Sequence, residues 1–499
     1  MTFFRFTLTI FLISILVFGS NIHFASSETE LKKVVQTDFK NWYSFSATPS
    51  NDSFGISTRI PGVEGAFAVV VTDDVGGVYV AYQSHWEEDN IESKSLHVYF
   101  AYSHDFGESW SKSFRVDDSE SSSVQCDSPS IAIDRNNGHI FVAWKDNRTG
   151  VAKVYIDKSV DRGVSFGSDV TVYDWPNDYI PPWLPNTVNL CVSNDGTIYI
   201  TWISYFGDCY TDCNISFTHS TDGGQTFKSP IIISSMEHEA ILAHPRLVID
   251  SNNVLYVVYS RRNSTSSSVH LVKSQNGGLS FDTPVKVTDV STQRYCGAAQ
   301  VAISPDGKIH VVWTDNRAGD GPQYLDIYYA TSLDGGLSFE PNIRVNDDLG
   351  VLPPNKHPHF TRGAQGTPTI TIGSDSIVHI FWEDFRNFVD DNNYCRDIYY
   401  ASSKNSTQFS DNFKVNYVHS EAKSVNCADP NLAIDSQDNF YLVYSDAPSG
   451  DNDYHYIYFM HIPQPSKTSS SIFGFQLIPL LTTFLIVIII AQKKTKSLK

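Results

Sequence analysis

The chain has 499 residues, with 55 acidic and 36 basic side chains and a formal net charge of −19. This acidic excess argues against proteins that bind nucleic acid, because binding to the phosphate backbone depends on lysine and arginine. Seven cysteines in a chain of this length permit disulfides but do not make a small disulfide scaffold.

Residues 1–27 predict a secretory signal peptide. The basic residue Arg5 precedes the apolar run FTLTIFLISILVFG, and the small residues FASS follow it. This order is typical of a signal peptide, and cleavage is expected near Ala25 to Ser27. Residues 28–462 then form the working part of the protein, outside the cell.

An octapeptide of the form Ser-x-Asp-x-Gly-x-x-Trp/Phe recurs along this part. It appears as SHDFGESW (103–110), SVDRGVSF (159–166), STDGGQTF (220–227), SQNGGLSF (274–281) and SLDGGLSF (332–339). Its Asp and Ser can hydrogen-bond the amides of a turn, its Gly tolerates a positive φ, and its final aromatic is expected between neighbouring sheets. The octapeptide therefore predicts a turn, and its recurrence predicts a repeat architecture.

Four short runs rich in Val, Ile, Tyr, Phe and Trp surround each octapeptide, as in 128–172. Such runs are typical of strands, and NNG (136–138), NDG (194–196) and PDG (305–307) are hairpin signals between the first two. The second strand of each unit is expected to end at an aromatic residue: Tyr82, Trp144, Trp202, Tyr259, Trp313, Trp382 and Tyr444. We predict an all-β, seven-bladed β-propeller of four-stranded antiparallel blades, with a six-bladed one as the alternative.

The last unit ends at YIYFMHIP (456–463) and lacks a fourth strand, which would leave an unpaired edge. The segment SFGISTRIPG (53–62) resembles the fourth strands SFRVDD and NIRVND. We therefore expect the N-terminal segment to close the ring. The sixth unit carries only a worn octapeptide, SSKNSTQF (402–409).

The C-terminal region predicts a membrane anchor. Residues 463–471 read as a Ser/Pro-rich stalk, 472–491 as a transmembrane helix and 492–499 as a basic cytoplasmic tail. A glycolipid-anchor signal and a sorting signal like those of archaeal surface proteins are the alternatives. The prediction is a single-pass protein of the cell surface, and Asn-x-Ser/Thr sites at Asn51, Asn147, Asn214, Asn263 and Asn405 fit an exported glycoprotein.

The octapeptide is the Asp box, and the chain resembles the sialidase-like superfamily of Asp-box, or BNR-repeat, propellers. That resemblance implies a substrate carboxylate held by three arginines, a Tyr nucleophile assisted by a Glu, and an Asp acid/base. It also implies an Arg-Ile-Pro tripeptide on the first inner strand. This chain has Arg59-Ile60-Pro61, but our register puts the inner strand at 65–74 and Arg59 on the closing strand.

Loops that follow the second strands repeat an Asp-x-Arg pattern on the face expected to carry a site. WKDNRTG (144–150), WTDNRAG (313–319) and WEDFRNF (382–388) place Asp146 with Arg148, Asp315 with Arg317 and Asp384 with Arg386. A local salt bridge that fixes each loop is the favoured interpretation. The alternative is a set of groups that face the central channel.

The candidate catalytic residues are Arg246, Arg317, Arg386, Tyr295 and Asp146. Further charged residues expected on the same face are Arg261, Arg262, Arg362, Glu87, Glu88, Asp89, Asp208 and Asp212.

We expect no cofactor and no catalytic metal. The acidic segments 387–397 and 449–455 could hold a structural Ca²⁺, although neither has the spacing of a calcium loop. Zinc is a weak alternative, since no paired Cys-x-x-Cys or His cluster completes a ligand set. Cys395–Cys427 and Cys209–Cys213 are disulfides compatible with the register.

Two functions stay open. The first is a membrane-anchored glycosidase of sialidase type, acting on sialic-acid-like or other surface glycans. The second is a non-catalytic propeller that binds a glycan or a glycoprotein. A glycan on Asn147, inside one of the Asp-x-Arg loops, would crowd the face that an enzyme needs, and so favours the second.

Overall fold

The computed structural model describes residues 57–62, 64–84, 95–120, 124–173, 188–205, 213–234, 240–263, 266–290, 295–317, 325–347, 365–386, 395–416, 425–446 and 456–463. The predicted signal peptide, transmembrane helix and tail, and the stalk beyond Pro463, lie outside these residues. Among the residues described, none forms a helix with the length and apolar character that crossing a bilayer demands.

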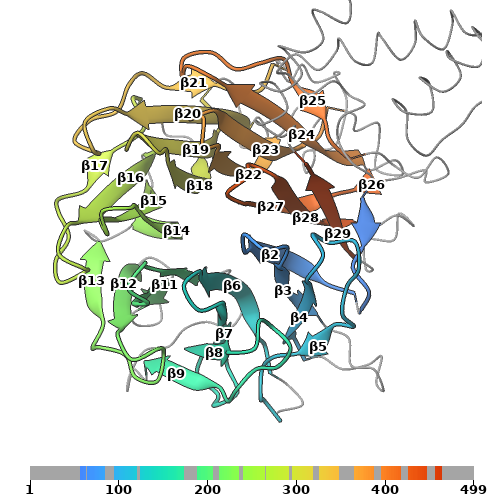
Figure 1. Ribbon diagram of the computed structural model, residues 1–499. Helices are drawn as coiled ribbons and strands as arrows, with labels where there is room; N and C mark the ends of the chain where they lie inside the picture. The colour runs from blue at the N-terminus through green and yellow to red at the C-terminus, as the bar shows by residue number, and fades with distance from the viewer. Residues whose placement is uncertain are drawn as a thin grey trace, which may run out of the picture. The chain divides into compact units, whose positions relative to one another are not determined.

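The strands form seven antiparallel sheets arranged about a common axis, with the first strand of each nearest to it (Figure 1). The first three blades are β2 (Ala66–Thr72), β3 (Val78–Ser84), β4 (His97–Ser103) and β5 (Phe114–Arg115); β6 (Asp127–Asp134), β7 (His139–Asp146), β8 (Lys153–Ser159) and β9 (Val170–Tyr173); and β10 (Asn189–Val192), β11 (Ile198–Tyr205), β12 (Cys213–Ser220) and β13 (Ile231–Ser234). The next three are β14 (Ala240–Ile249), β15 (Leu255–Asn263), β16 (Ser267–Ser274) and β17 (Val285–Lys286); β18 (Cys296–Ile303), β19 (Ile309–Asp315), β20 (Asp326–Ser332) and β21 (Ile343–Arg344); and β22 (Gln365–Ile372), β23 (Val378–Asp384), β24 (Cys395–Ser403) and β25 (Phe413–Lys414). The seventh contains β27 (Ala428–Ile434), β28 (Phe440–Asp446), β29 (Tyr456–Ile462) and β1 (Thr58–Arg59).

The N-terminal strand closes the ring, as predicted. Thr58 pairs with Phe459 and Arg59 with Tyr458, so β1 is the outer strand of the seventh blade. Ile60 continues the contact through its N–H, which donates to the carbonyl of Ile457 at 2.9 Å. Arg59 thus lies on the outer strand and the first inner strand is β2, as the register required.

One blade has more strands than predicted. In the sixth blade a two-residue strand, β26 (Val425–Asn426), pairs in parallel with the start of β24. Leu96 and Gln125 form a similar parallel bridge between the first two blades. In both places the chain that enters the next blade adds itself to the third strand of the blade it leaves.

The Asp boxes form the turns that the sequence predicted. In the first box, the carboxylate of Asp105 accepts hydrogen bonds from Ser103 Oγ at 2.6 Å and from the N–H of Ser109 at 2.8 Å, while Gly107 takes a φ of 88°. The final aromatic lies between blades: Trp110 packs edge-on against Phe459 with ring centroids 4.9 Å apart. The boxes therefore stabilise the joints between neighbouring sheets.

The worn box of the sixth blade differs from the predicted alignment. Ser403, not Ser402, takes the place that Ser332 has in the fifth blade, because Val378 pairs with Ser403 as Ile309 pairs with Ser332. The turn from Ser403 to Phe409 is thus one residue shorter than that from Ser332 to Phe339.

The predicted aromatic residues of the second strands lie in the core. Trp144, Trp202, Trp313 and Trp382 are among the largest fully buried side chains. Each strand continues past its aromatic by at least two residues, which corrects the predicted strand ends. Those additional residues carry the polar groups that hold neighbouring blades together.

Candidate functional site

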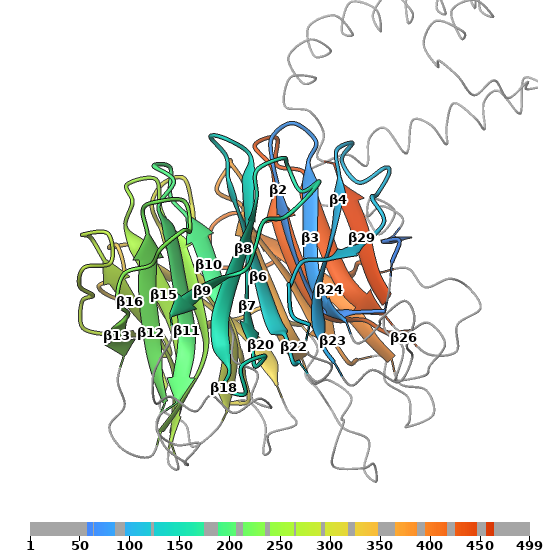
Figure 2. The ribbon, with the colours of Figure 1, turned by 90° about the horizontal axis from the view of Figure 1, so that it is seen from below.

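Inner strands carry a bulge near the end where the second-to-third strand loops gather. The strands run along the axis, so turns collect at two opposite faces, and this face is the one away from the Asp boxes (Figure 2). The register of β2, β6, β14, β18, β22 and β27 shifts there, and Phe67, His244, Ala298 and Asp429 take positive φ values at the bulge.

Glu383 of the sixth blade binds the backbone of Asp429 in the seventh blade at this level. Glu383 lies near the end of β23, and its Oε1 accepts the backbone N–H of Asp429 at 2.7 Å and the hydroxyl of Thr367 at 2.5 Å. Its Oε2 lies 3.3 Å from the guanidinium of Arg396, which sits over the ring of Phe385. Glu383 is buried, whereas Asp429 is partly exposed on the bulge of the inner strand.

The environment favours the protonated form of Asp429. Burial and the charge of Glu383 raise the pKa of the Asp429 carboxyl, and the more distant charge of Arg396 only partly offsets them. A carboxyl group whose surroundings raise its pKa can act as a proton donor. This arrangement is suited to general acid catalysis.

The sequence held a signal for this pair that we did not use. Inner strands contain x-Pro-x tripeptides, SPS, HPR, TPT and DPN, whose first residue is the bulge position. Aligned on the proline, Asp429 is the one acid among Ser128, His244, Thr367 and itself. Glu383 lies inside the WEDFRNF loop that the sequence did single out.

Arg246 is the predicted site residue that the structure places on an inner strand. It follows the bulge of β14, and its Nε donates to Gln300 Oε1 of the fifth blade at 3.2 Å. Within the described residues it forms no ion pair, and burial lowers its pKa to about 10. Burial, together with the charge of Arg246, lowers the pKa of His244 to about 4. A guanidinium without a carboxylate partner is suited to hold an anion.

Arg246 belongs to a ring of polar side chains on successive inner strands. Asn189 Oδ1 accepts the N–H of Leu247 at 2.6 Å, and Asn431 Oδ1 accepts the N–H of Val70 at 3.0 Å. These asparagine side chains therefore form hydrogen bonds from one blade to the next. Arg246 differs from them because its side chain carries a charge.

Tyr295 lies just before β18, beside the end of β15. The guanidinium of Arg262 is 5.9 Å from the centroid of its ring. Burial raises the pKa of Tyr295, and the charge of Arg262 acts in the opposite direction. The ring folds back over Gly297, where a Cβ would lie 2.2 Å from the phenol oxygen, so a larger residue there would displace the ring of Tyr295.

The Asp-x-Arg loops hold neighbouring blades together. Asp315 Oδ2 accepts both Nε and Nη2 of Arg317, at 2.9 and 2.6 Å, as the local salt bridge predicted. Nη1 of Arg317 then reaches Asp289 of the fourth blade at 2.6 Å. Asp289 and Asn342 in turn accept each other's backbone N–H, at 2.9 and 3.0 Å. We call this arrangement the seam clasp.

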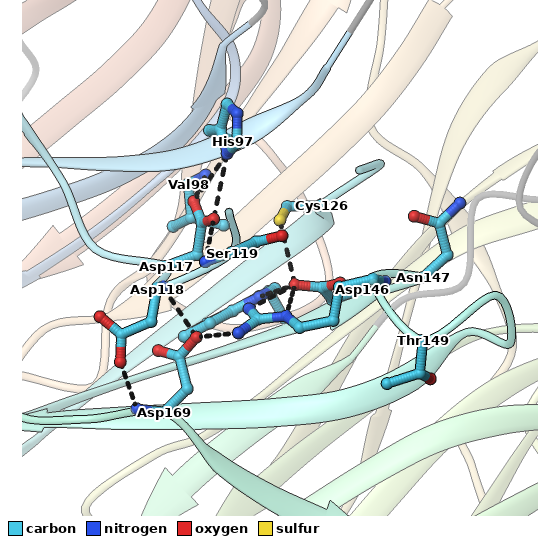
Figure 3. A network of polar contacts seen from close by, with 12 residues as sticks. His97, Val98, Asp117, Asp118, Ser119, Cys126, Asp146, Asn147, Thr149 and Asp169 are labelled. Carbon is cyan, nitrogen blue, oxygen red and sulfur yellow. Dashed lines mark hydrogen bonds and ion pairs between the residues drawn. The ribbon is translucent and has the colours of Figure 1, made fainter. Parts of the chain in front are cut away.

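The clasp recurs at two other seams. Arg386 pairs with Asp384 at 2.7 Å and with Asp347 of the fifth blade at 2.9 Å. Arg148 pairs with Asp146 Oδ2 and with Asp169 at 2.6 Å, and Asp169 binds the backbone of Asp118 in the first blade (Figure 3). The structure therefore does not bring Asp146, Arg317 and Arg386 to one point, because each lies in its own seam. Tyr295 adjoins the seam of Arg317, where its carbonyl accepts the N–H of Asn316 at 3.1 Å.

A buried group with metal-binding side chains adjoins the clasp of Arg148. His97 Nδ1 lies 3.0 Å from Asp117, and Cys126 completes a set whose ligand atoms lie within 4.8 Å of one another (Figure 3). The same positions in the fifth and sixth blades hold Asp326 with Asn346, and Asp397 with Asn416. The recurrence of a hydrogen-bonded pair at these positions indicates that the pair of His97 and Asp117 has a structural role in its blade.

The predicted bridge from Cys395 to Cys427 is wrong. Cys427 is a free, fully buried thiol whose sulfur accepts a hydrogen bond from Asn416 Nδ2 at 3.2 Å. The parallel pairing of β24 and β26 sets Cys395 opposite Val425, two residues before Cys427. Cys209 lies outside the described residues.

Other predicted residues also fall outside the described part: Arg362, Glu87, Glu88, Asp89, Asp208, Asp212 and nearly all of the two acidic segments at 387–397 and 449–455.

Family models match two parts of the chain. A BNR repeat-containing family model matches residues 185–346, and a BNR/Asp-box repeat model matches residues 101–112. The chain is a seven-bladed propeller that carries BNR/Asp-box repeats. This confirms the resemblance predicted from the octapeptides.

Solved structures similar to this Asp-box propeller share little sequence with it. A protein of unknown function from Dyadobacter fermentans covers 81% of this chain and 100% of its own, at 14% identity and a TM-score of 0.47. The NanB sialidase of Streptococcus pneumoniae covers 88% and 73%, at 11% identity and 0.46. The α-L-arabinofuranosidase Arb93A of Fusarium graminearum covers 68% and 93%, at 14% identity and 0.45. A search of curated protein sequences finds no match.

Proposed function

We propose that this Asp-box propeller is a glycoside hydrolase whose reaction centre is the pair Asp429 and Glu383. The observation that carries the proposal is the hydrogen bond from the Asp429 N–H to Glu383, together with the raised pKa of the Asp429 carboxyl. The Asp429 carboxyl protonates the leaving oxygen as the glycosidic bond breaks, a water molecule adds to the anomeric carbon, and the proton that this water loses returns to the Asp429 carboxylate. Asp429 is the more exposed of the two and takes the role of proton donor.

Glu383 acts through Asp429 rather than on the sugar. It is buried, and it is held by Thr367, Arg396 and the Asp429 backbone. Its charge keeps the proton on Asp429 until the leaving oxygen takes it. Glu383 is thus a positioning residue in this mechanism.

Arg246 supplies the substrate preference. Its guanidinium lies on an inner strand of the same ring and forms no ion pair within the described part of the chain. We therefore propose an acidic sugar of the sialic-acid kind as the substrate. Export and anchoring, predicted from residues 1–27 and 472–491, would place this activity on surface glycans.

The test is turnover of fluorogenic glycosides by the purified protein, with an acidic sialoside compared against a neutral arabinoside. We expect the parent to release the fluorophore from the sialoside, and Asp429→Asn to lower kcat at least 100-fold, since general acid catalysis contributes about 10²- to 10⁴-fold. Asp438→Asn, an acid of the opposite face, is the matched control and keeps its rate. No turnover by the parent of any glycoside would refute the proposal.

The alternative, a non-catalytic glycan-binding propeller, is favoured by one observation. The guanidinium groups of the three clasps, those of Arg148, Arg317 and Arg386, are already ion-paired with aspartates of the propeller, so they are not available to hold a substrate carboxylate. Binding of a sialoside without release of its aglycone, weakened by Arg246→Met and unchanged in Asp429→Asn, would establish this alternative.

A further inference from the structure

A cavity of about 350 Å³ lies between the fifth and sixth blades, on the face of the Asp boxes. Its lining includes Thr331, Leu333, Glu340, Asn405 and Thr407. This is the face opposite the bulged ends of the inner strands, so the cavity is separate from the reaction centre proposed above.

The shortened box of the sixth blade borders this cavity. The turn that begins at Ser403 has one residue fewer than the box at Ser332, and Ser406 takes a φ of 58° near the place of the usual glycines. Phe409 still packs against Tyr329 of the fifth blade, with ring centroids 5.1 Å apart. The contact between Phe409 and Tyr329 thus still joins the two blades, although the turn from Ser403 is shorter. The shorter turn leaves space beside it for the cavity.

Asn405 replaces the box aspartate and presents its amide nitrogen. Its Oδ1 accepts the N–H groups of Thr407 and Gln408, at 3.1 and 3.2 Å, and the hydroxyl of Ser403 at 3.4 Å. Nδ2 makes no hydrogen bond within the described residues, and the side chain is exposed. Asn405, Ser406 and Thr407 form the acceptor sequence for N-linked glycosylation.

The lining suits a pyranose ring. Leu333, with 60% of its surface exposed, offers an apolar side, and Pro341 and Ile343 also line the cavity. The side chain of Thr331, in a residue only 4% exposed, also lines the cavity. A sugar placed here would bury the apolar surface of Leu333, Pro341 and Ile343.

We propose that Asn405 carries an N-linked glycan whose first N-acetylhexosamine occupies this cavity. In the attachment, Nδ2 of Asn405 forms a bond to the anomeric carbon of a lipid-linked oligosaccharide donor. The bond from that carbon to the pyrophosphate breaks, the lipid pyrophosphate leaves, and the amide loses one proton. The proposal relies on the export predicted from residues 1–27 and is independent of the glycosidase activity.

The experiment uses the full chain produced in a secretory eukaryotic host. Glycopeptide mass spectrometry is expected to find Asn405 occupied. An endoglycosidase that leaves one sugar on the asparagine is expected to keep the melting temperature, because the sugar in the cavity remains. Thr407→Ala, which removes the acceptor sequence, is expected to lower it by about 2 °C.

Thr407→Ser is the matched control, since it keeps the acceptor sequence and the melting temperature. The same two variants made in a bacterial cytoplasm, without glycosylation, separate the sugar from the side chain and are expected to melt together. An unmodified Asn405 peptide would overturn the proposal. Equal melting temperatures for the trimmed protein and for secreted Thr407→Ala would overturn the seating of the sugar.

Discussion

Arg317 and Asp289 lie in different blades and are joined by an ion pair of 2.6 Å. The same guanidinium binds Asp315, whose side chain is completely buried. One side chain therefore satisfies a buried carboxylate in its own blade and a partly exposed one in the blade before it. The Asp-x-Arg pattern repeats this joint at Arg386, whereas at Arg148 the second carboxylate, Asp169, lies in the same blade and itself binds the backbone of Asp118 in the blade before.

Loss of the Arg317 side chain should destabilise the fold strongly. Arg317→Ala leaves Asp315 buried without a counter-ion, which costs about 3 to 5 kcal/mol in comparable cases. We expect a loss of that order in the free energy of unfolding, measured by urea denaturation. The control is Lys308→Ala, because Lys308 pairs with Asp306 on the surface and such pairs contribute about 0 to 1 kcal/mol. Equal, small losses in both variants would contradict the buried clasp.

Asp157 should make the protein less stable at neutral pH than at mildly acidic pH. Burial and the charges of Asp169 and Asp118 raise the pKa of Asp157 to about 6, and burial likewise raises that of Asp169 to about 6. An unfolded Asp ionises near 3.9, so the folded state takes up its proton first as the pH falls, and stability rises from pH 7 towards pH 4.

Asp157→Asn removes the free-energy cost of keeping an ionised carboxylate buried at position 157. We expect it to be more stable than the parent by about 2 kcal/mol at pH 7, with the difference vanishing near pH 4, in urea denaturation series. Asp161→Asn is the control of opposite sign, because hydrogen bonds from Ser165 lower the pKa of Asp161. A parent whose stability does not change between pH 7 and pH 5 would speak against the buried pair.

Cys126, Cys296 and Cys427 should be unreactive in the native protein. All three thiols are buried, and burial raises the pKa of each one. Because the thiolate is the reactive form, we expect no labelling of these residues by an aromatic disulfide reagent under native conditions and full labelling in urea. Rapid native labelling of any of them, mapped by mass spectrometry, would show that its seam opens.

The closing strand should act on stability and not on catalysis. Ile60, 3% exposed, packs in a core shared by the first and seventh blades, so Ile60→Ala is expected to cost about 2 to 4 kcal/mol. Arg59 lies over the ring of Tyr456 at 3.4 Å on the exposed edge, so Arg59→Ala should cost at most about 1 kcal/mol. Its glycosidase rate should equal that of the parent; a loss of rate with retained stability would instead assign Arg59 to the reaction centre.

The fold could be predicted because its determinants are local and repeated. Asp105 and Gly107 form a turn with their own neighbours, and β1 could be recognised because the last blade lacked a strand. The ends of the strands were harder to predict from the sequence. The residues after Trp313 look like a loop, yet Thr314 and Asp315 still pair with β20.

The candidate site was less predictable because it depends on which blades adjoin. Asp429 and Glu383 are 46 residues apart and meet only through the seam between two blades. The sequence placed the loop of Arg317 on the face of the channel, but it could not show in which direction the Arg317 side chain points. That direction is fixed by Asp289, which no local pattern links to it.

Closing the ring with β1 has a consequence for how the chain folds during synthesis. Six blades are built from contiguous sequence, but Thr58 must find Phe459, which the ribosome adds about 400 residues later. The last step of folding is therefore the one with the largest loop-closure entropy. Until then the edge of β29 stays open, and because an unpaired strand edge can pair with another chain, we expect aggregation to be most frequent at this stage.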